Sequence, residues 1–536
     1  MSHVSNVKFL QRFKLFAFLL PLVILCLGFA VSAASGLIHD YSNNYFPALL
    51  LTEGIAPELV VFDIFKFNSY VWSKGYPNEL TDFYLNSPFI ATFFYPLALI
   101  KNAYYSKLIF NLLCILLFAV ALQVFGKNHL TKTERPFLLL IPLIFFTPIR
   151  NNIEFGQLYL LVVSLTLLAY HYILVQKNYL GGSLLSLAIH IKLFPVFYCI
   201  PLIYTKKWKS VAALIVSSLA LFCISIYTGG WSFWQNYLFE VLPNAIANES
   251  TVDFRSNAQS FDVFLKTLLV QDDYYNPDAV FNSVTAFKLI SILLKSSVLA
   301  VAISLSFRHK EQMFQVLSIW VVALFLTQPR TATYAQILWL IPAIEVLKSD
   351  LSTKWKVAFS CLLLLVCNFP FHWFRGAPIV IEFSRLWLSI ATAGIVFYAF
   401  HFRFNSRFWK GFLIILVPFL ALSVQSEVSS NGSEYVLKQK NHFMIHDFGV
   451  ENNRLTYQAL GKKGNETIHT DIHIESFETD VCKLVNNEIY YKNTPLTNNH
   501  SIKKTPVLIN GCDVYYLTDY HSRRGAFTLK KINVCP

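Results

Sequence analysis

Short polar segments interrupt the apolar blocks of this chain, and their residue types are the ones that could do chemistry. In the first segment, HDYSNNYF, Asp40 is followed by Asn44 and Tyr45, directly after an apolar block. A carboxylate at a membrane surface can serve as a general base that takes the proton of a hydroxyl group. The alternative is a helix cap or an interfacial turn, because Asp and Asn favour both.

Two more polar segments lie at or inside apolar blocks further along the chain. In RNNIEFGQLYLL, Glu154 and Gln157 open an apolar block, where amides and an acid either only cap a helix or help to place an anionic ligand at its N-terminus. In AIHIKLFP, Lys192 precedes Pro195 within a block long enough to hold the ammonium group away from either membrane surface. Lys192 is therefore a candidate to bind a lipid-linked phosphate, and the alternative is a lysine that snorkels to the surface.

The last two polar segments fall in loops between apolar blocks. DFRSNAQSF carries Asn257, Gln259 and Ser260, and this group of donors and acceptors suits sugar hydroxyls, although polar loops are common. TQPRTATYAQ carries Arg330 and Tyr334. An arginine at the end of a span can bind a phosphate through two hydrogen bonds, and its alternative role is to anchor the span at the interface.

The elements that must position these residues are membrane helices. The chain has 536 residues, of which 55% are hydrophobic and 14% charged, and the charged share is far below that of a soluble globular protein. Its apolar blocks approach the roughly 20 residues that cross a bilayer. The net charge of +13 comes from short basic clusters between these blocks. That placement follows the positive-inside rule and argues against a nucleic-acid partner.

The order of apolar blocks and basic clusters predicts the topology. No convincing cleavage site follows the first block, so residues 15–34 are expected to form the first span, with a cytoplasmic N-terminus. Further spans are predicted near 210–228, 287–307, 312–329, 333–348, 357–373, 386–402 and 411–426. Residues 87–100 either span or dip back, and 180–203 form one broken span or a hairpin. The fold class is therefore an all-α polytopic membrane protein of about eleven to thirteen spans.

The composition changes at the end of the last predicted span. We expect a membrane domain over 1–426, with 35–87 as its first extracytoplasmic loop, and a small β-rich extracytoplasmic domain over 427–536. The tail contains Cys482, Cys512 and Cys535. One disulfide among them is plausible outside the cell, and their spacing does not identify the pair. The tail either contacts an acceptor or is a folded cap, and its sequence does not choose between these roles.

The spacing of the polar segments is more specific than any one of them. The stretch from Gln157 to the basic cluster at 206–209 resembles the core of glycosyltransferase family 87, a group of GT-C type membrane enzymes. The matching positions are Gln157, Gly181, Gly182, Ala188, Lys192 and Pro195. SNAQSF is similar to the family's outer-loop motif. The resemblance covers roughly residues 15–350. Two positions depart from the family pattern: Asn44 replaces a tyrosine, and Tyr334 stands about where many members have a histidine.

The resemblance implies a GT-C fold with its active site on the extracytoplasmic face of the plasma membrane. It implies transfer, with inversion, of a hexose such as mannose from a polyprenyl-phosphate sugar to a lipid or glycan acceptor. Asp40 would be the catalytic base, and Lys192 and Arg330 would bind the donor phosphate. The remaining candidates would bind substrate: Asn44, Tyr45, Glu154, Gln157, Asn257, Gln259, Ser260 and Tyr334. The resemblance implies no cofactor, although some GT-C relatives use a divalent metal ion.

Three other functions fit the same residues. Lysine and arginine in broken spans also serve transporters or flippases of lipid-linked saccharides, although the sequence has no convincing internal repeat. A polymerase or ligase of surface polysaccharide would use a polyprenyl-diphosphate glycan instead of a monophosphate sugar. An inactive homologue that acts as a scaffold is the third alternative, because the family histidine is missing.

Overall fold

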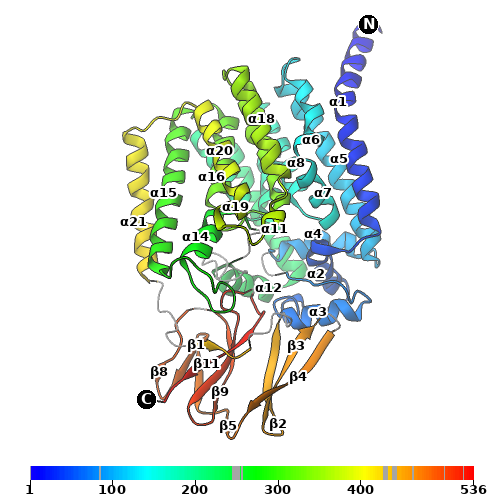
Figure 1. The fold of residues 1–536 in the computed structure, drawn as a ribbon. Helices are drawn as coiled ribbons and strands as arrows, with labels where there is room; N and C mark the ends of the chain where they lie inside the picture. The colour runs from blue at the N-terminus through cyan, green and yellow to red at the C-terminus, as the bar shows by residue number, and fades with distance from the viewer. Residues whose placement is uncertain are drawn as a thin grey trace.

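The chain folds into a bundle of helices with a β-rich tail at one end (Figure 1). The computed structural model describes residues 2–83, 86–243, 254, 258–425, 433–437, 444–461, 464–499, 501–522 and 524–535. The N-terminus lies at the end of the bundle opposite the tail (Figure 1). We call the end of the bundle that carries the tail the tail face, and the other end the opposite face.

The α-helices of the first half are α1 (Ser2–Ala34), α2 (Ser42–Thr52), α3 (Ile64–Ser73), α4 (Phe89–Ala98), α5 (Ala103–His129), α6 (Ile141–Ile144), α7 (Phe146–Phe155), α8 (Tyr159–Leu174), α9 (Asn178–Ile191), α10 (Ile200–Tyr204), α11 (Trp208–Gly229) and α12 (Trp231–Asn236). Those of the second half are α14 (Phe261–Leu269), α15 (Val284–Arg308), α16 (Met313–Thr327), α17 (Leu340–Lys348), α18 (Thr353–Asn368), α19 (Ile379–Glu382), α20 (Ser384–Ala399) and α21 (Ser406–Gln425). Short 3-10 or π turns join several of them, among them η1 (His39–Tyr41), η4 (Phe194–Cys199) and η6 (Thr333–Trp339).

Several of these helices are apolar enough to indicate a membrane protein. In the described residues, four are both long and apolar enough to cross a bilayer, in α1, α5, α11 and α15. A fifth is added if the segments Arg135–Ile144 and Phe146–Phe155, which meet at 63°, count as one span. This number is well below the eleven to thirteen full spans expected from the sequence. Other expected spans correspond to short apolar helices, such as α16 and α20, or to broken ones.

The predicted block at 180–203 shows how a span is broken. α9 ends at Ile191, Lys192 is in an extended conformation, and Pro195 begins the η4 turn that leads into α10. Proline has no backbone N–H and its ring clashes with the preceding helical turn, so the chain cannot continue as one α-helix here. The block at 333–348 instead begins as the 3-10 turn η6 and continues into α17 with helical backbone angles at the junction. A count of apolar residues alone does not detect such breaks.

The loop expected at 35–87 is folded. Helix α2 packs on the short helix α4, and both contribute to a buried core with Tyr41, Phe46 and Phe94. α4 has only ten residues, so the segment 87–100 does not cross the bundle as a full span. The loop therefore forms a compact layer on the tail face of the bundle (Figure 1).

The tail consists of β-sheets. A five-stranded antiparallel sheet has the order β1 (Ser433–Tyr435), β11 (Thr528–Asn533), β10 (Asp513–Thr518), β9 (Lys503–Ile509) and β5 (Phe477–Glu478). A second sheet contains β2 (Ile445–Glu451), β3 (Arg454–Gly461) and β4 (Gly464–His473), and a third contains β6 (Cys482–Val485), β7 (Glu488–Tyr491) and β8 (Thr494–Pro495). Cys512 and Cys535 form a disulfide, and Cys482 is a free thiol.

The tail is docked on the bundle through contacts with separate segments of the tail face. Ile64 and Phe65 of α3 belong to the hydrophobic core of the tail. The Tyr435 hydroxyl donates a hydrogen bond of 2.7 Å to Asp272, and Arg524 forms an ion pair of 2.9 Å with Glu240. The tail is therefore held against the same face that carries the first loop.

Candidate functional site

Asp40 and Gln157 meet although 117 residues separate them. The Gln157 side-chain amide donates a hydrogen bond of 2.5 Å to Oδ2 of Asp40, which lies in η1. Gly156, before Gln157, ends α7 in the left-handed conformation. A Cβ at Gly156 would lie 2.5 Å from Cβ of Tyr41, so a larger residue would push the two segments apart. The Gly-Gln pair therefore brings the amide to the carboxylate.

The backbone before Asp40 is held by two buried charged side chains that the sequence analysis missed. The Glu79 carboxylate accepts hydrogen bonds from the backbone N–H groups of Ile38 and His39, at 2.5 and 2.9 Å. The Lys107 ammonium donates to the carbonyls of Leu37 and Glu154, at 2.8 and 2.5 Å. Lys107 lies within an apolar helix, and this intramembrane charge was the signal that could have found it. Glu79 looked like an ordinary loop residue.

The imidazole of His39 lies next to Asp40 and adds to the electrostatics of the turn. Burial, and then the positive charge of Lys107, lower the pKa of His39 below its ordinary value. The imidazole is therefore neutral near pH 7. A neutral His39 therefore adds no positive charge beside the Asp40 carboxylate.

Lys192 reaches the same place from the broken end of α9. Its ammonium donates a hydrogen bond of 3.3 Å to the Asn86 side-chain oxygen and lies 5.9 Å from the ring centre of Tyr159. It is close enough to Asp40 for the two charges to interact. The Asn86 amide in turn donates to the Asn44 side chain at 3.2 Å. Asn86 thus links the first loop to Lys192, and nothing in its local sequence pointed to this role.

Tyr334 completes this cluster from the second half of the chain. Its ring centre lies 5.2 Å from that of Tyr159, and its backbone carbonyl accepts a hydrogen bond of 2.9 Å from Asn152. Asn151 donates to the Thr333 hydroxyl at 2.8 Å. The amides of α7 therefore join the start of η6 to the end of the bundle that carries Asp40. We name Asp40, Asn44, Asn86, Gln157, Tyr159, Lys192 and Tyr334 the central cluster.

A second group of predicted residues gathers around the loop before η6. The Ser260 hydroxyl donates to the Pro329 carbonyl at 2.5 Å, and the Thr331 hydroxyl donates to the Gln259 carbonyl at 2.7 Å. The Gln259 side-chain oxygen accepts the backbone N–H of Arg385 at 3.2 Å. Arg330 lies between Pro329 and Thr331, and Tyr334 follows Thr331 by three positions. The two groups are therefore at most about 11 Å apart along the chain.

Arg385 was missed in the sequence because it lies in an apolar stretch after the last recognised motif. Its guanidinium group is buried, lies 4.4 Å from the ring centre of Phe371 and donates to the Thr331 carbonyl at 3.1 Å. The outer loop of Gln259 and the helix α20 are thereby joined to the Arg330 segment.

Three predicted site residues belong to neither of these two groups. Tyr45 is buried and its hydroxyl donates to the Ile100 carbonyl at 2.8 Å, which is a packing position. The Glu154 side chain forms an ion pair of 2.8 Å with Arg150. Asn257 lies outside the described residues. In the part of the chain that the structure describes, no three His, Cys, Asp or Glu side chains gather as metal ligands.

The central cluster combines a carboxylate, a lysine and three amides at one end of an apolar bundle. A carboxylate that accepts one amide hydrogen bond keeps lone pairs to accept a proton from a substrate hydroxyl. A lysine beside it can stabilise negative charge that develops on a leaving group. A proton acceptor and a cation in this arrangement can support the transfer of a group to a hydroxyl when the leaving group is an anion.

The sequence of the middle of the chain matches a known family. A model of glycosyltransferase family 87 matches residues 84–329, somewhat less than half of the chain. No curated protein matches the chain. The family match confirms the resemblance that the sequence motifs indicated and supports a membrane glycosyltransferase. The matched segment contains Asn86, Gln157, Lys192 and Gln259, whereas Asp40, Arg330 and Tyr334 lie outside it.

Proposed function

We propose, with the match to glycosyltransferase family 87 as the premise, that the chain transfers a hexose from a polyprenyl-phosphate sugar to a hydroxyl of a lipid or glycan acceptor. We propose mannose as the hexose and the extracytoplasmic face as the site of transfer. The observation that carries this proposal is the contact of Asp40 with Gln157, with Lys192 in electrostatic reach of the carboxylate.

In the proposed reaction Asp40 is the general base. The acceptor oxygen attacks the anomeric carbon as its proton passes to the Asp40 carboxylate, and the bond from that carbon to the phosphate oxygen breaks. The new bond forms on the face opposite the leaving group, so the anomeric configuration inverts. Polyprenyl phosphate leaves as a stable anion and needs no acidic partner, unlike the leaving group in most glycoside hydrolases.

The cations of the two groups bind the phosphate in this proposal. Lys192 stabilises the charge that develops on the phosphate oxygen, and Arg330 binds the same phosphate from the loop before η6. The amides of Asn44 and Gln157 and the ring of Tyr334 are proposed to bind sugar. Gln259 and Ser260 support the loop that carries Arg330.

The test is sugar transfer by the purified full-length protein in nanodiscs. We would supply radiolabelled polyprenyl-phosphate mannose and a lipid extract from the source cell, and compare wild type with Asp40→Asn. We expect label in a new product with wild type and a rate at least about 100-fold lower with the variant, since a general base contributes about 100- to 10,000-fold. Asp63→Asn is the matched control, because Asn caps helix α3 as well as Asp does.

Equal rates for wild type and Asp40→Asn would contradict the role of Asp40. No transfer by the wild type would lead to assays with glucose and arabinose donors, and failure of all three would contradict the transferase proposal.

A transporter of lipid-linked saccharides is the second candidate, and one observation favours it. The chain breaks its helix at Lys192, and broken helices with a cation at the break are typical of transporter binding sites. The two functions are separated by movement of a fluorescent lipid-linked saccharide across the bilayer of proteoliposomes. A transporter would move it with or without Asp40→Asn, and a transferase would not move it.

A further inference from the structure

A cavity lies on the opposite face, away from the central cluster. Its volume is about 440 Å³, and three turns between helices surround it. The α8–α9 turn contributes Gln176, the α10–α11 turn contributes Lys206 and Lys207, and the α15–α16 turn contributes Lys310 and Glu311. The third of these turns lies more than 100 residues after the second, so the cavity depends on the tertiary fold.

The first two turns have the same backbone geometry. Gln176 and Lys206 both have positive φ, 63° and 54°, and each is followed by a lysine whose N–H bonds back to the helix over 2.8 Å. These are the bonds of a Schellman motif, in which glycine is the usual left-handed residue. A lysine in that conformation is less favourable than glycine, so Lys206 retains its side chain there at a cost to the fold.

The third turn, between α15 and α16, is held in place by the end of α20. Arg308 donates a hydrogen bond of 2.6 Å to the His401 carbonyl, and His309 contacts the Phe400 carbonyl at 3.0 Å. These bonds fix the end of α15 against the end of α20, directly before Lys310. Lys206, Lys207 and Lys310 therefore lie in turns whose backbone positions are fixed by hydrogen bonds within the protein.

The lining of the cavity has two chemical characters. Its rim carries three lysines and one glutamate, which leaves two net positive charges. Leu174, Tyr204 and the buried Met313 supply an apolar wall. A cationic rim beside an apolar wall at the end of membrane helices matches a phosphate attached to an apolar chain.

We propose that this cavity binds the phosphate group of an anionic ligand, with the headgroup of an anionic phospholipid as the occupant that its apolar wall favours. With the topology expected from the sequence, the opposite face is cytoplasmic, so the site is separate from the proposed sugar transfer and does not depend on it. Lys206, Lys207 and Lys310 bind the phosphate oxygens, and the acyl chains of the lipid lie along the exposed helix α11.

The test is lipid retention by the full-length protein, measured by native mass spectrometry after delipidation and exposure to equal amounts of phosphatidylglycerol and phosphatidylcholine. The site variant carries Lys206→Gln, Lys207→Gln and Lys310→Gln. The control carries Lys132→Gln, Lys354→Gln and Lys410→Gln, which are exposed, lie on the same face and remove the same charge. We expect wild type and control to prefer phosphatidylglycerol, and the site variant to lose this preference at least tenfold.

Two outcomes would overturn the proposal. An unchanged preference in the site variant would mean that its lysines serve membrane topology and helix ends only, as cations at helix C-termini also can. An equal loss in the control would mean that the whole basic face attracts anionic lipid. If inorganic diphosphate displaces phosphatidylglycerol from the wild type, the site holds a soluble phosphate; if it does not, the site holds the lipid.

Discussion

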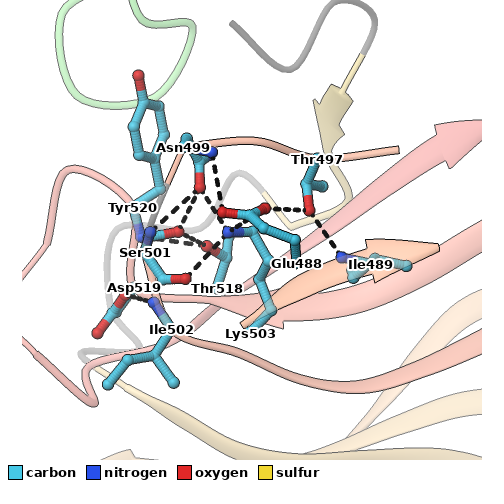
Figure 2. Close-up of polar contacts among 10 residues, drawn as sticks. All are labelled: Glu488, Ile489, Thr497, Asn499, Ser501, Ile502, Lys503, Thr518, Asp519 and Tyr520. Carbon is cyan, nitrogen blue, oxygen red and sulfur yellow. Dashed lines mark hydrogen bonds and ion pairs between the residues drawn. The ribbon is translucent and has the colours of Figure 1, made fainter. Parts of the chain in front are cut away.

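Two lysines, one partly buried in the bundle and one fully buried in the tail, show how the surroundings of a charge distinguish a binding site from a structural contact. Lys503 in β9 donates to Asn499 at 2.6 Å and to the Ser501 carbonyl at 2.9 Å, and it lies 3.0 Å from the Glu488 carboxylate (Figure 2). The three donors of its ammonium group are thus occupied by the protein. The ammonium group of Lys192, in contrast, makes one hydrogen bond with the described residues, the 3.3 Å bond to Asn86.

The carboxylates beside these lysines differ in the same way. Glu488 also accepts the Thr497 hydroxyl at 2.6 Å and the Asn499 backbone N–H at 3.1 Å (Figure 2). Asp40 is only partly buried and is held by the Gln157 amide. A buried ion pair whose hydrogen-bonding groups are all occupied by the protein specifies and stabilises a fold. A partly buried pair with fewer hydrogen bonds to the protein can still bind a ligand. The same residue types therefore predict opposite results on substitution.

The largest expected effect is on the stability of the tail. Lys503→Met leaves the Glu488 carboxylate buried without its cation, which costs about 3–5 kcal/mol. Hydrogen exchange of the β9, β10 and β11 amides in the full-length protein measures this loss. The substitution Lys483→Met in β6 is the control, because Lys483 is exposed and its loss changes stability little. Equal protection in Lys503→Met and wild type would remove the distinction between the two lysines.

The next effect is on catalysis. Lys192→Met removes a cation proposed to stabilise the leaving phosphate, and we expect kcat/KM for the donor to fall about 100-fold, equivalent to about 2.7 kcal/mol. The thermal midpoint of unfolding should change little, since the ammonium group of Lys192 makes a single, long hydrogen bond with the residues that the structure describes. Lys101→Met, at an exposed position, is the control. A fall in stability without a fall in rate would place Lys192 with Lys503 as a structural residue.

A smaller effect is expected from the residue that holds the Asp40 turn. Glu79→Gln replaces one of two accepting oxygens by an N–H group that faces a backbone N–H, and we expect kcat to fall about tenfold, equivalent to about 1.4 kcal/mol. Glu79 acts through the turn, so KM for the donor should stay near the wild-type value. The split between kcat and KM is the measurement. A rise in KM with an unchanged kcat would show that Glu79 shapes binding and does not position the base.

The smallest effect is a pH dependence in the tail. Asp519 is buried in the loop after β10 and accepts the backbone N–H groups of Ile502 and Gly525. Burial raises the pKa of Asp519 to about 6, which these hydrogen bonds partly oppose. Because the folded pKa is above the unfolded value, the stabilising contribution is complete below about pH 4 and is lost as pH rises through about 6. The tail should therefore be about 1 kcal/mol more stable from this group at pH 5 than at pH 7.

The pH prediction is tested by amide exchange of the tail at pH 5 and 7 in wild type and Asp519→Asn. The variant cannot ionise at this position, so its stability should change less between the two pH values. Identical pH dependence in both proteins would show that other groups govern it.

Much of the candidate site was predictable because polar side chains beside membrane helices carry a free-energy cost, and they are therefore rare unless they have a function. Asp40, Gln157, Lys192 and Tyr334 stand out in sequence as polar residues beside apolar blocks, and the family motif orders them. Asn86 and Glu79 do not stand out, because an amide and an acid in a polar loop are ordinary. Tyr159 was missed because an aromatic residue in an apolar block usually packs in the core or faces lipid.

The sequence by itself determined what local composition controls: the apolar blocks, the basic clusters between them and the β-rich composition of the tail. It also restricted the disulfide to three cysteines. Only the tertiary structure decided that Cys512 pairs with Cys535, that the helix breaks at Lys192, and that Asn86 joins the first loop to that break. These outcomes depend on which distant side chains occupy the same space, and neither periodicity nor composition carries that information.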